Sequence, residues 1–154
     1  MMRLIILAVG KIKKDYFHEA IREYLKRLGP YAKIDIEEIE AEPFKRESDK
    51  DKAKKIEGER ILKFLEKNEG NIILLDEKGK NFSSHQFAEF MEDKNERIIF
   101  VIGGALGFHE NILEKPYRKL SLSKMTFPHE MARMILLEQI YRASAIISGK
   151  EYHY

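Results

Sequence analysis

The sequence contains no cysteine among its 154 residues, so disulfides, thiolate metal sites and cysteine nucleophiles are all excluded. It also lacks any apolar run near the roughly 20 residues that span a bilayer. The opening stretch, MMRLIILAVGKIKK, has an apolar core too short for a secretory signal and no small-residue cleavage site. These absences favour a cytoplasmic protein without a membrane segment.

Several catalytic signatures are missing as well. No G-x-x-x-x-G-K-[ST] phosphate loop occurs, and the first predicted strand is followed by GKIKK instead of a dinucleotide-binding G-x-G-x-x-G. No G-x-S-x-G nucleophile elbow is present. The five histidines form no i, i+4 pair and no His-x-His, which argues against a metal site. A nicotinamide oxidoreductase is therefore disfavoured, because it would need the missing fingerprint.

What is present fits an ordinary globular chain. Hydrophobic residues make up 44% and charged residues 35%, and the length predicts a single domain over residues 1–154. The net charge is only +2, but from Lys115 onward seven lysines and arginines stand against three acidic residues. This segment is either a modest phosphate-attracting surface or a scatter of ordinary surface charge.

Strand and helix patterns alternate along the chain, which predicts an α/β domain with a mainly parallel sheet. Asp15 is a candidate helix cap, Ser83 or Ser84 is another, and EKGKN after the third strand reads as a turn. The inner side of the second helix is expected to carry Ala53, Ile56, Leu62 and Leu65. We expect strands over 3–9, 33–39, 71–76, 97–103 and 119–123, and helices over 15–28, 48–67, from 83 or 84 through 91, 108–114 and 128–149.

The last helix is apolar on most of its faces. Pro128 suits its first position and Gly149 its end. Met134, Leu137 and Ile140 do not fit one narrow stripe with its other apolar residues, so the helix lies either at the centre of the fold or against a second subunit.

Two stretches are candidates for function. After the fourth strand the chain reads GGALG, and ligands of open α/β sheets bind beyond the carboxyl ends of strands. Glycine there permits a positive φ and a close backbone approach, although a simple tight turn explains the same residues. The chain ends YHY, either a frayed terminus or a set of rings held near Arg142, where they could stack on bases.

The sequence resembles a known family from end to end. The matching stretches are LIILAVGKIK, EYLKRLGPYAKIDIEEI, ILLDEKGK, FVIGGALG, LSLSKMTFPHEMARMILLEQIYRA and the tail YHY. Together they are similar to the SPOUT-superfamily methyltransferases that act on N3 of a pseudouridine in the 23S RNA of the large ribosomal subunit. The run from Leu120 to Ala143 is the most specific part of the resemblance.

The resemblance implies a fold and a cofactor that the residue patterns alone do not give. It implies a SPOUT-type sheet with a deep trefoil knot in the C-terminal segment, which general rules treat as nearly absent. It also implies a homodimer and S-adenosylmethionine held in the knot loops. Carried over position by position, the cofactor contacts are Leu75, Gly103, Leu122, Ser123, Lys124, Met125, Thr126 and Phe127.

The resemblance further places Arg142, His129, Tyr152 and His153 near the RNA substrate. Arg142 is the candidate for stabilising the anion that develops at the pseudouridine, and His153 could accept the N3 proton. Family tails usually end Tyr-His followed by Lys or Arg, whereas Tyr154 stands here. An rRNA methyltransferase that acts on 23S rRNA in the ribosome is therefore expected, with a non-enzymatic ribosome-binding module as the alternative.

Overall fold

Strands and helices follow one another in the order that the sequence predicts. The computed structural model describes residues 1–92 and 95–154. The elements are β1 (Met2–Val9), α1 (Asp15–Leu28), β2 (Ala32–Ile39), η1 (Glu47–Asp49), α2 (Lys50–Glu66), β3 (Asn71–Asn81), α3 (Ser84–Glu92), β4 (Ile98–Ile102), α4 (Glu110–Leu113), β5 (Arg118–Ser121) and α5 (His129–Ser148).

The five strands form one sheet in the order β2-β1-β4-β3-β5, and each neighbouring pair is parallel. The predicted α/β class with a mainly parallel sheet is confirmed. In a parallel sheet the carboxyl ends of all strands meet at the same edge. The loops that follow β3, β4 and β5 therefore gather there, which is the edge where a ligand is expected.

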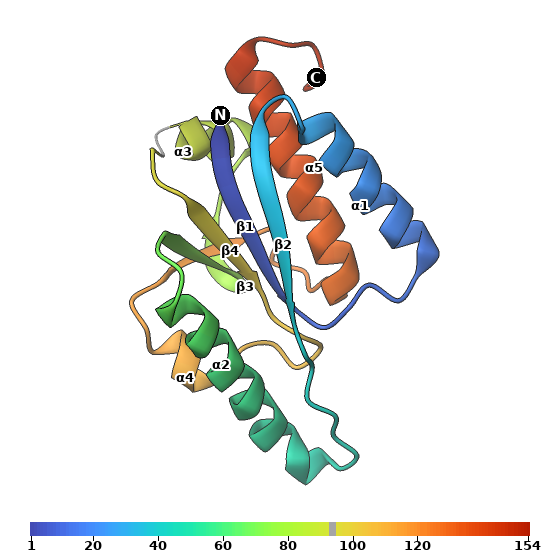
Figure 1. Ribbon diagram of the computed structural model, residues 1–154, viewed down its shortest axis with the longest axis vertical. Coiled ribbons are helices and arrows are strands. Elements are labelled where there is room, and N and C mark those ends of the chain that lie inside the picture. The colour runs from blue at the N-terminus through green and yellow to red at the C-terminus, as the bar shows by residue number, and fades with distance from the viewer. Residues whose placement is uncertain (93–94) are drawn as a thin grey trace.

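Each face of the sheet is covered by its own helices (Figure 1). Along β1, Leu4, Ile6 and Ala8 pack with α1, α3 and α5, while alternate residues such as Ile5 and Leu7 pack with α2 and α4. Successive side chains of a strand point to opposite faces, so a strand between two layers is apolar throughout. The uninterrupted apolar run of β1 predicts this position, and its inner residues are buried.

Local chemistry explains several helix ends. Ser83 Oγ accepts a hydrogen bond from Gln86 N at 3.1 Å, and Gln86 Oε1 accepts one from Ser83 N at 2.8 Å, which is a capping box for α3. Gly149 ends α5 with φ 71°, as predicted for a glycine after a helix.

The prediction that Asp15 caps the first helix is wrong, because Lys14 occupies the cap position and Asp15 lies in the first turn. Pro128 precedes α5 instead of opening it.

Two other predictions need correction. EKGKN is no turn, because β3 continues to Asn81 across an irregularity and pairs again with β5 through Lys80 and Leu120. On α2, Ala53 and Leu65 are buried as predicted, but Glu57 and Ile61 complete the buried face, and Ile56 and Leu62 lie at its margin.

The position of α5 bears on the oligomer. Leu137 and Ile140 are fully buried within the single chain, and Met134 is half-buried. The helix lies between α1 and α3 on one face of the sheet (Figure 1). Of the two positions that the sequence leaves open, the centre of the fold explains these side chains. They do not by themselves require a second subunit.

Across the described residues, no helix is both long enough and apolar enough to cross a bilayer.

Candidate functional site

A cavity of about 770 Å³ opens at the carboxyl edge of the sheet. Three chain segments line it: 75–78 of β3, 102–108 at and after the end of β4, and 122–123 with 125–129 before and at the start of α5, with Leu113 and Ala132 at its margin. Most of these side chains are apolar. The volume lies within the range of about 300 to 1,000 Å³ that is usual for small-molecule sites.

The structure brings nearly all of the predicted cofactor contacts to this one cavity. Lys124 is exposed and stands outside the lining. The predicted contacts that line the cavity are Leu75, Gly103, Leu122, Ser123, Met125, Thr126 and Phe127. Their contact with a cofactor stays a prediction, but they come from three distant parts of the sequence and face one space.

The glycine loop is shaped by two different requirements. Gly107 has φ +76°, a left-handed conformation that favours glycine. Gly103 and Gly104 do not have a positive φ. A Cβ on Gly104 would lie 3.1 Å from Val9 Cγ1 and 3.3 Å from Glu57 Oε1, so a side chain there would have to displace these neighbours. A Cβ on Gly103 would lie 3.4 Å from the Gly107 backbone and the Phe108 ring. The loop is thus a packed unit.

Hydroxyl groups shape the segment after β5. Ser121 Oγ donates to Ser123 O at 2.8 Å, and Ser123 Oγ accepts from Met125 N at 3.0 Å. Thr126 Oγ1 donates to a carboxylate oxygen of Glu77, which joins this segment to the end of β3. Side-chain hydrogen bonds of this kind fix a loop without regular structure.

His129 is the predicted catalytic residue that lies at this cavity. Burial lowers the pKa of His129 below its usual 6.5; nearby Arg133 and Lys13 act in the same direction, and Glu130 opposes them. The imidazole is therefore neutral at pH 7. A neutral ring can donate or accept a hydrogen bond without repelling a cationic ligand.

Buried charges attach the first turns of α5 to the rest of the fold. Arg133 is buried; its Nη1 donates to Glu38 Oε2 at 2.8 Å and its Nη2 to the Gly10 carbonyl at 3.1 Å. Glu130 Oε1 accepts from the backbone N–H of Lys14 at 3.1 Å. These contacts tie α5 to the carboxyl ends of β1 and β2, which fixes His129 one turn away.

The other three predicted catalytic residues form a cluster at the far end of α5. Arg142 Nη1 lies 3.1 Å from His153 Nδ1, and the Arg142 guanidinium lies 4.9 Å from the centre of the Tyr152 ring. Glu138 accepts from Arg142, and Tyr152 Oη donates to Glu138 at 3.3 Å. Of the two arrangements that the sequence leaves open for the tail, the structure shows Tyr152 and His153 held near Arg142, whereas Tyr154 is 98% exposed.

Burial, a hydrogen bond with Tyr24 and the neighbouring Glu138 raise the pKa of Tyr152 to about 12, although Arg142 opposes the shift. Tyr152 therefore remains a protonated phenol at neutral pH, able to donate a hydrogen bond but not to act as a base. The His153 ring meets the His85 ring edge-on at 4.9 Å between centres. The tail is thereby also in contact with α3.

The structure does not bring His129 and the tail together. α5 runs from the carboxyl edge of the sheet to the opposite edge, where the chain ends (Figure 1). His129 and Arg142 are 13 residues apart on this helix, about 20 Å at the usual rise per residue. One chain thus carries two separate clusters, a cavity with His129 and a cation with two aromatic rings.

Some residues of both clusters escape sequence reasoning. Asp76 and Glu77 line the cavity, and their place directly after the apolar part of β3 is a signal that could have found them. Glu138 lies four residues before Arg142 on a predicted helix, which is a spacing that brings opposite charges together. Arg133 is a charge among the apolar residues of a helix that is apolar on most faces, and such a residue usually has a partner when it is buried.

Within the described residues, no cluster of three or more His, Cys, Asp or Glu side chains has an arrangement that could hold a metal ion.

Comparisons with known proteins agree with the geometry. A family model described as "Predicted SPOUT methyltransferase" matches residues 2–153. A protein of Carboxydothermus hydrogenoformans named "Ribosomal RNA large subunit methyltransferase H" is 46% identical over 159 residues, 99% of this chain and 99% of its own length. A protein of the same name from Kosmotoga olearia is 45% identical over 157 residues, 99% of this chain and 100% of its own.

Solved structures are similar in fold. A putative methyltransferase of Legionella pneumophila, in complex with the bound cofactor SAM, matches with a TM-score of 0.52 and 13% identity over 93% of this chain. This chain spans 66% of that protein's length. A probable methylase family protein of Haemophilus influenzae matches with a TM-score of 0.56 and 13% identity, over 99% of this chain and 70% of its own.

Proposed function

Because the chain belongs to the SPOUT methyltransferase family, we propose that it transfers a methyl group from S-adenosylmethionine to N3 of a pseudouridine in the RNA of the large ribosomal subunit. The observation that carries this proposal is that nearly all of the predicted cofactor contacts line one cavity. The full-length similarity to relatives whose name gives the RNA of the large ribosomal subunit supports the choice of substrate. The proposal includes the cytoplasm as the place of action, where ribosomes are found.

The cavity suits S-adenosylmethionine by its chemistry. Its apolar side chains and the backbone of the glycine loop fit an adenosine, and Asp76 and Glu77 add negative charge. His129 is neutral because burial lowers its pKa, so Lys78 is the one cationic side chain among the described residues of the lining. When bound, the cofactor supplies a methyl group activated by a positively charged sulfur. The residues present therefore fit the group.

The cluster at the far end of α5 has the chemistry that the acceptor requires. A pseudouridine N3 must lose its imide proton before it is a good nucleophile. Arg142 can donate hydrogen bonds to the carbonyl oxygens beside N3, where negative charge develops. We assign the proton acceptance to His153 Nδ1, which accepts a hydrogen bond from Arg142 in the single chain and becomes free when the guanidinium turns to the substrate. The phenol of Tyr152 donates to Glu138, which also accepts from Arg142 and so helps to orient the guanidinium.

These two sets of residues can act on one substrate only if they come from two chains. Since about 20 Å separates His129 from Arg142 along one helix, we propose a homodimer in which the tail of one chain serves the cavity of the other. The resemblance supports the same assembly. Sedimentation equilibrium should show a dimer at micromolar concentration, and a monomer there would contradict this part of the proposal.

A deep trefoil knot in the C-terminal segment belongs to the same proposal. The resemblance and the family membership support it.

Methyl transfer to ribosomes tests the proposed function directly. Ribosomes that lack this modification should gain one labelled methyl group per large subunit from labelled S-adenosylmethionine, at N3 of a pseudouridine. Ribosome binding without incorporation would instead support the non-enzymatic module. Incorporation at another nucleotide would retain the enzyme class and overturn the assigned position.

A further inference from the structure

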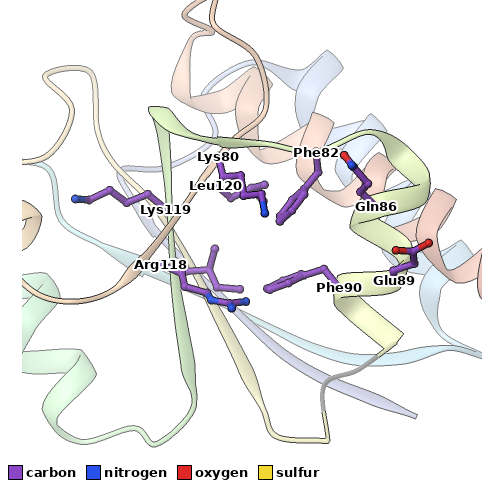
Figure 2. Close-up of a pocket in the computed structure, with 9 residues that line it drawn as sticks. Lys80, Phe82, Gln86, Glu89, Phe90, Arg118, Lys119 and Leu120 are labelled. Atoms are coloured by element: carbon purple, nitrogen blue, oxygen red, sulfur yellow. The ribbon is translucent and has the colours of Figure 1, made fainter.

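A second cavity, of about 540 Å³, lies beside the edge strand β5. Figure 2 shows its walls: Phe82 and Phe90 point into the space from the end of β3 and from α3, and Lys80, Arg118 and Leu120 face them from the strands. It is separate from the cofactor cavity, whose lining it does not share.

Aromatic rings and cations are paired within this cavity. The Phe82 and Phe90 rings stack with centres 5.6 Å apart and planes at 27°. Lys80 Nζ lies 5.1 Å from the centre of the Phe82 ring, and the Arg118 guanidinium lies 5.4 Å from the centre of the Phe90 ring. Both cations are exposed and both rings are half-buried. Lys119 is different, because its Nζ donates to the Leu113 carbonyl and its side chain points away (Figure 2).

We propose that this cavity binds an unpaired nucleotide of the substrate RNA, an inference that rests on the proposed function. Flat apolar rings stack on any base, and neighbouring cations attract the phosphates on either side of it. The combination also argues against an acidic peptide as the partner, because carboxylates would use the cations and leave the rings without a role. The Oε1 atom of Gln86 accepts from Ser83 N, and the amide N–H groups of this exposed side chain at the rim can donate to a base edge.

The cations give the site a way to open. In the free protein Lys80 and Arg118 each cover a ring face. A base that enters replaces the Lys80 ammonium over Phe82, and the long lysine side chain then reaches the adjacent phosphate. Glu89, exposed on α3 at the opposite wall, disfavours a phosphate there and so directs the backbone of the RNA toward the strand side.

The two cavities are close enough to hold one RNA strand. Leu120 lines this cavity and Leu122 lines the cofactor cavity, two residues later and at most about 7 Å of extended chain. Gly79 packs against β5 beside this stretch, since a Cβ on it would lie 2.6 Å from the Lys119 backbone. The cavity would therefore hold a nucleotide near the one that is methylated, and it would contribute to affinity for RNA instead of to the chemical step.

Binding of the full-length protein to unmethylated ribosomes tests this site. Phe82→Leu keeps an apolar side chain but removes the ring, and it should weaken binding by about 5- to 150-fold, the range for loss of one stacked base. Phe82→Tyr keeps the ring and should bind nearly as the parent does. Lys80→Gln and Arg118→Gln should each reduce the slope of log affinity against log salt by about 0.7 to 1. Lys33→Gln, on the edge strand at the other side of the sheet, is the control with the same charge change.

Further measurements separate this site from the chemistry. Cofactor affinity by calorimetry and kcat at saturating ribosomes should be unchanged in Phe82→Leu, while KM rises. With Gln86 replaced by the photo-crosslinking residue benzoylphenylalanine, the protein should attach to RNA; attachment to a ribosomal protein overturns the proposal. The proposal is also overturned if the Phe82→Leu variant binds ribosomes with the affinity of the parent and methylates them normally. A parent chain that neither binds nor methylates ribosomes overturns the proposed function as well.

Discussion

The first turns of α5 and its last turns carry different chemistry, although one helix joins them. At the first turns, Arg133 is buried and bonded to Glu38 and Gly10, and His129 is held neutral beside a cavity. At the last turns, Arg142 is half-buried and bonded to Glu138 and to the chain's own tail. One end is thus fixed by the core of the fold, and the other is a partly exposed surface with a cation and two rings.

This difference explains how a single fold can divide a two-substrate reaction. The fixed end suits a small ligand that needs a preformed cavity, whereas the exposed end suits a large RNA that approaches from outside. Neither end contains all of the proposed catalytic residues. Alterations at one end should therefore affect one substrate and leave the other nearly untouched.

The largest expected effect is on methyl transfer when Tyr152–Tyr154 are deleted. The deletion removes the His153 and Tyr152 contacts with Arg142 at the far end of α5. We expect single-turnover methylation of unmodified ribosomes at saturating cofactor to fall by about 10² to 10⁴-fold, the usual cost of losing acid–base catalysis. His153→Ala should reproduce much of this loss.

Cofactor binding is the control for the tail deletion. Calorimetric affinity for S-adenosylmethionine should stay near the parental value, because none of the deleted residues lines the cavity. Turnover at the parental rate would show that the contacts of the tail contribute nothing to catalysis, which would then be reassigned to Arg142 first.

The opposite pattern is expected for Gly103→Val. A Cβ at position 103 would already touch the Gly107 backbone and the Phe108 ring at 3.4 Å. The two Cγ methyl groups of valine must therefore displace the loop or enter the cavity. Cofactor affinity by calorimetry should fall more than about tenfold, or about 1.4 kcal/mol. Gly103→Ala, which makes only ordinary contacts, should lose much less. Unchanged affinity in a valine variant that is folded by circular dichroism would refute the assignment of the loop.

The next largest effect is on the free energy of unfolding, when the ion pair at the first turns of α5 is broken. Glu38→Ala removes the ion pair of the buried Arg133 guanidinium and leaves it the 3.1 Å hydrogen bond to the Gly10 carbonyl. The free energy of unfolding in urea should drop by about 1 to 3 kcal/mol, discounted because Glu38 is itself one-third exposed. Glu37→Ala, on the exposed neighbouring residue, should change it by less than about 0.5 kcal/mol. Equal effects would mean that the pair does not anchor α5.

The smallest expected effect is on the pH dependence of cofactor binding. Because burial holds the folded pKa of His129 below 6.5, the ring is neutral above that pH and gains a proton only as the pH falls below it. The free energy of folding that depends on a neutral ring is fully present above pH 6.5. It is lost as the pH falls from 6.5 to the lower pKa of the folded state. Affinity for the cationic cofactor should weaken about two- to tenfold over the same window, as like charges approach. His129→Asn should remove this dependence, and an unaltered profile would show that His129 does not face the cofactor.

Much of the fold can be predicted because it depends on local patterns. The apolar run of β1, the capping serine Ser83 and the helix-ending Gly149 are each recognisable within a few residues. The extension of β3 is not, because EKGKN contains turn-forming residues and becomes a strand only by pairing with Leu120, some 40 residues later. Glu57 is buried on α2 for a similar reason, since its carboxylate accepts the backbone N–H of Glu42 from a preceding loop.

The candidate site can be predicted as a set of residues but not as an arrangement. Family resemblance names residues that the structure then places at a common cavity, such as Leu75 and Phe127. The separation of His129 from Arg142 follows from 13 positions on one predicted helix, a signal that the sequence already contains. The burial of Leu137 and Ile140 within one chain depends instead on how α5 packs between α1 and α3.

The most direct test of a site shared by two chains is complementation between two impaired variants, at a cofactor concentration that saturates the parental cavity but not the Gly103→Val cavity. One chain lacks Tyr152–Tyr154 and keeps its cavity, and the other carries Gly103→Val and keeps its tail. After subunit exchange, half of the dimers are mixed and each has one intact site, so methylation of ribosomes should recover to about a quarter of the parental rate. No recovery, in a sample where native mass spectrometry shows mixed dimers, would contradict the account and place the whole site within a single chain.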